Sequence, residues 1–327
     1  MSDVTSQDPQ SSVLDGADLD ATKRDGGSPP MSGRPPAHLG RTAAPAPIRL
    51  AGGKFSDDLR AILMVWKREL IRFRRNGLRI ATSIVQPVLY LFVLGTGLSS
   101  LVGKGMPAGS GFNFKTFMFP GIVCMTILFT SIFSSISIVW DREFGFLREM
   151  LVAPVRRSSL VIGKCIGGAT TSFLQAVIML ALAGLVGVPY TPLLMITLIG
   201  EMLLLSLSIT ALGIVLAARI KQLDSFAVVM QFVVLPLYFL SGALFPLRGL
   251  PGWLEFLTRV DPMTYAVDPM RRTVLEHLSI PEAARSIFAA PVTWFGWQVP
   301  IGLELGVVAA FGAVMLGISI KLFSKMD

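Results

Sequence analysis

Residues 140–164 read WDREFGFLREMLVAPVRRSSLVIGK and separate two long apolar runs. No charged residue occurs from Thr116 to Val139, and the next charged residue after Lys164 is Glu201. The segment itself holds eight charged side chains: Asp141, Arg142, Glu143, Arg148, Glu149, Arg156, Arg157 and Lys164. Because a charge in the centre of a bilayer is costly, we expect this charged segment to form a loop at a membrane surface. Its excess of Arg and Lys over Asp and Glu indicates the cytoplasmic side.

The charged segment also carries a helical pattern. Apolar residues recur at helical spacing beside acids and bases: Phe144, Leu147 and Leu151, with Phe146 and Met150, next to Glu143, Arg148 and Glu149. This pattern predicts a short amphipathic helix along the inner membrane face, ended by Pro154. Such a helix offers a docking surface to a soluble partner.

Composition places the chain among integral membrane proteins. Of its 327 residues 52% are hydrophobic and only 15% are charged, and the mean hydropathy is +0.64. The net charge of +8 fits cytoplasmic loops that face anionic membrane lipid, so no nucleic-acid partner is expected. Cys124 and Cys165 fall in apolar runs, which argues against a disulfide, and His38 and His277 lack metal-ligand spacing. We therefore expect no metal site and no bound cofactor.

Two segments precede the apolar runs. Residues 1–54 are rich in Ser, Asp, Gly and Pro, lack the apolar core of a secretory signal, and are expected to form a disordered cytoplasmic tail. Residues 55–78 show a helical period. One face is apolar, with Leu59, Ile62, Leu63, Trp66, Leu70 and Phe73, and the rest is basic, with Arg60, Lys67, Arg68, Arg74 and Arg75. We expect an amphipathic helix in the membrane interface.

Residues 79–327 are expected to form an all-α polytopic transmembrane domain with six spans. The apolar runs place them at about 80–103, 116–139, 165–188, 193–218, 225–245 and 297–320, each long enough to cross the hydrocarbon core. Between the fifth and sixth spans, 253–260 and 270–278 have short helical patterns. They are expected to be outer or shallow re-entrant helices, which are allowed at membrane depth only when protein covers them.

The distribution of basic residues orients the spans. From Lys54 onward, 17 Lys and Arg lie in the segments expected inside and seven in those expected outside. Short cytoplasmic loops keep positive charge, so both termini are expected in the cytoplasm.

Two motifs resemble those of a known family. Residues 143–154 read EFGFLREMLVAP. Residues 240–246 read LSGALFP and are followed by PGWL at 251–254 and DPMTYAVD at 261–268. Together with six spans, they make residues 57–325 resemble the type 2 ABC (ABC-2) exporter permeases. The likeness is greatest to the branch associated with multidrug resistance and lipid or polyketide efflux.

The resemblance implies the permease half of an exporter in a bacterial cell membrane. The transporter would be completed by a second permease copy and by two ABC ATPase subunits that bind ATP and magnesium. A homodimer of permeases is favoured over a heterodimer. The resemblance implies that the inner loop forms the coupling helix that contacts the ATPase, here Arg142, Glu143, Phe144, Leu147, Arg148, Glu149 and Met150. The chain itself has no Gly-rich phosphate loop, so it is expected to be non-catalytic.

Glu201 is the one unequivocal acid inside a span and is a tentative residue of the substrate pathway. Its alternative role is to lock two helices through a hydrogen bond. For Gln175 and Gln231, packing hydrogen bonds are expected.

Other functions stay open at this point. An exporter of polysaccharide or teichoic acid has the same architecture, but it would need a wide, aromatic-lined channel. A stand-alone carrier would show more intramembrane ionisable groups. A membrane enzyme would require a nucleophile and base or paired acids at membrane depth, and neither arrangement is visible.

Overall fold

The computed structural model describes residues 55–102, 114–146, 155–247, 249–278, 291–294 and 296–325. The tail at 1–54 lies outside them. Six helices in this part of the chain are long and apolar enough to cross a membrane, so the expected all-α polytopic fold is confirmed.

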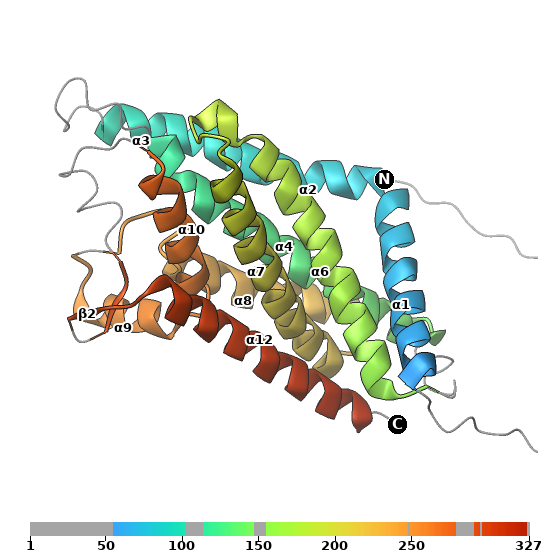
Figure 1. The fold of residues 1–327 in the computed structure, drawn as a ribbon. Helices are drawn as coiled ribbons and strands as arrows, with labels where there is room; N and C mark the ends of the chain where they lie inside the picture. The colour runs from blue at the N-terminus through green and yellow to red at the C-terminus, as the bar shows by residue number, and fades with distance from the viewer. Residues whose placement is uncertain are drawn as a thin grey trace, which may run out of the picture. The chain divides into compact units, whose positions relative to one another are not determined.

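The chain enters the bundle through two helices that run crosswise to each other (Figure 1). Helix α1 spans Phe55–Arg75, and the first membrane span follows as α2 (Gly77–Leu89), the π-helix η1 (Tyr90–Leu94) and α3 (Gly95–Val102). Pro87 lies within α2 shortly before the π-helical turn, a common form of local adjustment along a helix that contains proline. The first span is only lightly covered by the rest of the protein.

Four helices form the core of the bundle. They are α4 (Phe114–Glu143), α6 (Arg157–Ala181), α7 (Pro192–Arg219) and α12 (Ile301–Ser324). Helix α7 lies among the other three, and α8 (Leu223–Leu240) packs mainly against α4. A 3-10 turn, η3 (Ala183–Val186), links α6 to α7. The buried cluster of Phe, Ile, Leu and Met side chains lies between these helices.

Small residues allow the core helices to approach closely. A Cβ atom added to Gly213 of α7 would lie 2.5 Å from Ser135 Oγ of α4, and one added to Gly312 of α12 would overlap Ser208 Oγ of α7. Ser131 of α4 donates a hydrogen bond to Ser172 of α6 at 2.9 Å. Close packing and interhelical hydrogen bonds are the forces that associate helices in lipid.

A short helix covers the opposite end of the bundle from α1. After α9 (Gly252–Val260), helix α10 (Thr264–Glu276) inserts against α4, α7 and α12 and is almost wholly buried. The hairpin of β1 (Thr293–Trp294) and β2 (Trp297–Gln298) then leads into α12. Both expected short helices are present; α10 is covered by protein and begins six residues before the predicted 270–278, whereas α9 is largely exposed. We call this end the α10 end and the opposite one the α1 end.

Several helix boundaries differ from the predicted ones. The third span begins at Arg157 instead of 165, and the second helix continues to Glu143. The prediction that the whole charged segment forms a surface loop was therefore wrong for 140–143 and 157–164. These turns remain helical because their charges find partners inside the protein. The sixth span begins at Ile301 instead of 297, because Trp297 and Gln298 belong to the hairpin.

Candidate functional site

Three buried charged side chains and the half-exposed Arg68 form an ion cluster at the α1 end. Lys164 of α6 donates to Glu69 Oε1 of α1 at 3.0 Å and to Asp141 Oδ2 of α4 at 2.5 Å. It also donates to Ser137 Oγ at 3.1 Å. Arg68 of α1 then binds both carboxylate oxygens of Asp141 at 2.7 Å. The cluster joins α1 to α4 and α6.

The pairing explains why charged residues can lie inside the bundle. The side chains of Lys164, Glu69 and Asp141 are 6%, 9% and 4% exposed. An ion removed from water in this way is tolerated only when opposite charge and hydrogen bonds replace its hydration. Removing one member would leave another buried without compensation.

Helix α1 packs along the first half of α6 in the same direction. Ser159 donates to Asp58 at 2.9 Å near the start of the contact, and Trp66 donates to Thr170 at 3.1 Å farther along. Between them, Gly163 and Gly167 of α6 lie against α1 so closely that an added Cβ would meet it at 2.9 and 2.8 Å. The spacing Gly163-x-x-x-Gly167 is a helix-packing motif in membranes.

Helix α1 buries one side against α6 and leaves part of its apolar face open. Val65 and Glu69 are buried against α6, whereas Leu59 and Leu63 of the predicted apolar face are about half exposed and remain available to the membrane interface. Glycines on α6 place α6 against the side of α1 that carries Glu69.

Two arginines of the charged segment bind the ends of other helices. Arg142 donates to the carbonyls of Ile220 at 2.8 Å and Ala218 at 3.0 Å, at the C-terminal end of α7. Arg157 donates to the carbonyl of Ser324 at 3.0 Å at the end of α12. The last carbonyls of a helix lack intrahelical donors and carry partial negative charge, so both contacts are favourable.

The predicted coupling residues divide between described and undescribed parts. Arg142 and Glu143 form the last turn of α4, and Phe144 lies in the turn that follows. Leu147, Arg148, Glu149 and Met150 lie outside the described residues. Phe144 is 62% exposed, and its ring centroid lies 5.7 Å from that of Trp140. The end of α4 therefore presents a pair of aromatic rings at the α1 end.

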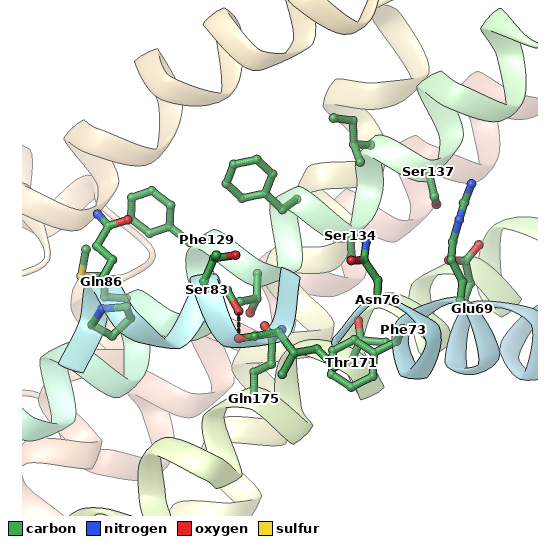
Figure 2. A pocket seen from close by; sticks show the side chains of 18 of the residues that line it. Glu69, Phe73, Asn76, Ser83, Gln86, Phe129, Ser134, Ser137, Thr171 and Gln175 are labelled. Atoms are coloured by element: carbon green, nitrogen blue, oxygen red, sulfur yellow. Dashed lines mark hydrogen bonds between the residues drawn. The ribbon is translucent and has the colours of Figure 1, made fainter. Parts of the chain in front are cut away.

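A cavity of about 600 Å³ lies beside the ion cluster. Figure 2 shows residues of α1 and α2, among them Phe73, Ser83 and Gln86, facing residues of α4 and α6, among them Phe129 and Gln175. The cavity reaches from the middle of α4 and α6 to the α1 end. Its wall includes Glu69 and Ser137, two groups that Lys164 binds. Its lining mixes aromatic rings with hydroxyl and amide groups.

Glu201 lies at the α10 end and does not line this cavity. Its carboxylate accepts a hydrogen bond from Thr273 of α10 at 3.2 Å, and the residue is buried. The contact favours the helix-locking alternative.

Neighbouring charges hold α10 in the same manner. Arg272 pairs with Asp268 at 3.1 Å and with Glu304 of α12. Arg271 donates to the carbonyl of Gly242 at 2.6 Å, and its guanidinium lies 4.1 Å from the centroid of the Phe117 ring. Burial lowers the pKa of Arg271 to about 10, so it stays charged at neutral pH.

Comparison with known proteins assigns this architecture to a family. Residues 60–275, about two thirds of the chain, match the ABC-2 type transporter family. The chain belongs to the ABC-2 type transporter family. It is 30% identical over 217 residues to the putative transport permease ycf38 of Cyanophora paradoxa, covering 65% of this chain and 73% of that protein. It is 28% identical over 219 residues to nodulation protein J of Rhizobium leguminosarum bv. trifolii, covering 66% and 81%. It is 24% identical over 213 residues to the inner membrane transport permease YadH of Escherichia coli strain K12, covering 64% and 81%.

Membership sets the general role of this ABC-2 permease. It is a multi-pass, non-catalytic membrane subunit of an ABC transporter, and such permeases work with an ABC ATPase subunit. The earlier resemblance to ABC-2 permeases is thereby confirmed.

The ion cluster and the cavity were missed at the level of sequence. The sequence pattern predicts a surface loop around Lys164 and gives no indication that Glu69 is buried. The one available signal was the row of small residues at four-residue intervals, Ser159, Gly163 and Gly167, which marks a helix contact beside Lys164.

Proposed function

We propose that this ABC-2 permease is the transmembrane subunit of an ATP-driven exporter that moves a hydrophobic or amphipathic compound out across a bacterial inner membrane. A second copy of the chain, in a homodimer, and two ATPase subunits carrying ATP and magnesium complete the transporter. Both termini lie in the cytoplasm, so the α1 end faces the ATPase.

The exposed end of α4 carries the proposal. Phe144 presents an apolar ring to solvent next to Glu143, at the start of the segment proposed to couple to the ATPase: Arg142, Glu143, Phe144, Leu147, Arg148, Glu149 and Met150. Aromatic side chains on a rigid helix are frequent anchors of protein interfaces. The adjacent Arg142 contact with α7 supports a path by which force on this segment reaches the spans.

The cavity supports a compact cargo. A volume of about 600 Å³ is within the range of pockets for small molecules. A polysaccharide or teichoic-acid polymer would need a continuous wide channel instead. We therefore favour a drug-sized or lipid-sized compound over the polymer alternative.

Copurification tests the proposal. The tagged full chain is extracted from its native membrane in mild detergent, and bound proteins are quantified by mass spectrometry. We expect an ABC ATPase subunit in equal amount to the permease. Phe144→Ala should reduce that recovery, because truncating a buried interfacial aromatic ring commonly costs more than about 1 kcal/mol.

Trp253→Ala provides the matched control. Trp253 is 67% exposed and lies on α9, away from the α1 end, so its removal should leave ATPase recovery unchanged. Absence of any ATPase, under conditions in which a known ABC transporter keeps its own, would overturn the proposal. If Phe144→Ala recovers as much ATPase as the unchanged chain, the docking surface does not lie at the end of α4.

A further inference from the structure

The cavity beside the ion cluster is lined in a way that selects a ligand. We propose that it binds an uncharged amphiphile whose head group carries hydrogen-bond donors, either hydroxyl or N–H, and whose apolar part lies against the aromatic wall. Such a molecule is available either as cargo or as a resident lipid of the membrane. The inference deepens the proposed function, and only its identification with cargo rests on that function.

The hydroxyl groups of the cavity face it as acceptors. Four of them donate their only hydrogen to a carbonyl of their own helix, at 2.6–2.9 Å: Ser83 to Ile80, Thr130 to Thr126, Ser134 to Ser131 and Thr171 to Gly168. A hydroxyl used in this way keeps oxygen lone pairs for an incoming donor. The wall is therefore rich in acceptors.

Gln175 adds an acceptor that lacks a partner. This side chain lies on α6, lines the cavity and is 5% exposed. Its Oε1 atom has no hydrogen-bond partner among the described residues. An unsatisfied buried carbonyl of this kind costs roughly 1–3 kcal/mol, which a ligand donor would recover. Figure 2 shows Gln175 and Thr171 on the same side of the cavity, opposite Ser83.

The charges around the cavity favour an uncharged head group. Lys164, the buried base next to the wall, already binds Glu69, Asp141 and Ser137. Glu69 itself lines the cavity and would oppose an anion. Arg72 is the basic residue of the lining and is exposed. On the side of the cavity that carries Glu69, a phosphate head group would face a carboxylate and hydroxyls whose hydrogens are already donated.

An acyl chain alone does not fit this lining. Phe73, Phe129 and Trp140 supply the apolar surface that a chain or ring would cover. The Oε1 atom of Gln175 would stay without a partner against hydrocarbon, at the cost of a buried unsatisfied polar group. A molecule with both an apolar part and a donor-bearing head satisfies both halves of the wall.

Fluorescence quenching tests the site directly, because Trp140 lines it. The full chain is placed in phosphatidylcholine nanodiscs and titrated with 1-(9,10-dibromostearoyl)glycerol, which carries two hydroxyl donors and a quenching chain. The comparison probe is the same molecule with both hydroxyls methylated. We expect saturable quenching by the hydroxylated probe at concentrations about three- to ten-fold below those of the methylated one.

Substitution of Gln175 tests whether the cavity recognises hydrogen-bond donors or only apolar surface. Gln175→Leu should weaken binding of the hydroxylated probe about three- to ten-fold and leave binding of the methylated probe unchanged. It should fold normally, since it removes an unsatisfied buried oxygen. Gln231→Leu is the control, because Gln231 is exposed on α8 and does not line the cavity. In Trp140→Phe the saturable quenching should disappear.

Three results would overturn the inference. Equal quenching by both probes, insensitive to Gln175→Leu, would indicate unspecific lipid contact. Tighter binding of 9,10-dibromostearic acid, a third probe whose head group is a carboxylate, would indicate an anion site at Arg72. The absence of a saturable signal that depends on Trp140 would exclude the cavity as the binding site. None of these results depends on an ATPase, so each leaves the copurification test of the proposed function unaffected.

Molecules extracted from the purified chain show whether the bound amphiphile is cargo or a resident membrane lipid. Molecules retained from native membrane and depleted by Gln175→Leu, but not by Gln231→Leu, are identified by mass spectrometry. A hydroxyl- or amide-bearing bilayer lipid assigns a lipid site, and a non-lipid amphiphile with such groups assigns a cargo site. Retention of the same molecules by both variants would contradict the inference.

Discussion

Replacement of Lys164 by Met is the most direct test of the ion cluster. The substitution keeps the length of the side chain and removes its charge. Asp141 keeps both hydrogen bonds to Arg68, but the Glu69 carboxylate loses the one partner that the described part of the chain gives it. Breaking a buried pair from one side costs about 3–5 kcal/mol, so we expect the free energy of unfolding to fall by that amount.

A double-mutant cycle assigns the loss to the pair. The free energy is measured by reversible unfolding in mixed micelles with increasing SDS. Glu69→Gln in the Lys164→Met background should recover at least half of the loss, because no uncompensated charge then remains on α1.

An exposed ion pair supplies the control for this cycle. Arg60 lies 3.9 Å from Asp57 on the same helix and is largely exposed, so Arg60→Met should cost less than about 1 kcal/mol. If Lys164→Met costs no more than Arg60→Met, or if the two substitutions in the cycle are additive, the argument for a buried cluster fails.

Three other substitutions test separate contacts. Gly163→Val should detach α1, because even a Cβ atom would lie 2.9 Å from its side chains, and trypsin should then cleave α1 faster; Gly200→Val, in open space, should not change the rate. Arg142→Ala should lower the free energy of unfolding by about 1–3 kcal/mol and speed hydrogen exchange in the last turn of α7, whereas unchanged exchange would refute the contact. Burial raises the pKa of Asp261 from 3.8 to about 8. Its contribution to stability is therefore fully present below the pKa of the unfolded state and is lost as the pH rises through the pKa of the folded state. Thermal denaturation should therefore show stability that falls between about pH 4 and pH 8 and a flatter profile for Asp261→Asn, and identical profiles would contradict the raised pKa.

The number of spans was predictable because it depends on composition alone. Each apolar run is long enough to cross a bilayer, and Pro and Gly mark the breaks between runs. The short helices between the fifth and sixth spans were also recognised, since they are too short and too charged to cross.

The ends of the spans and the site were not predictable in the same way. A hydropathy pattern treats Lys164 as a residue that needs water, but a partner on another helix can replace water. That partner, Glu69, lies 95 residues earlier in the chain. Helical periodicity likewise gives the apolar side of α1, not the side that a neighbouring helix covers. The cavity depends on how far α2 stands from α4 and α6, which no local pattern encodes.

The end of α4 concentrates the contacts that the proposed coupling would require. Asp141 binds Arg68 of α1 and Lys164 of α6, and the next residue, Arg142, binds the end of α7. Two adjacent residues therefore connect α4 to three neighbours. If the proposed function holds, a partner that binds Phe144 acts within one helical turn of Asp141 and Arg142. A displacement of the end of α4 must then be shared by α1, α6 and α7, or it must break buried ionic contacts. Because breaking them is costly, shared movement is the favoured outcome. The cavity lies against the same cluster through Glu69 and Ser137, so such a movement would also reshape its wall.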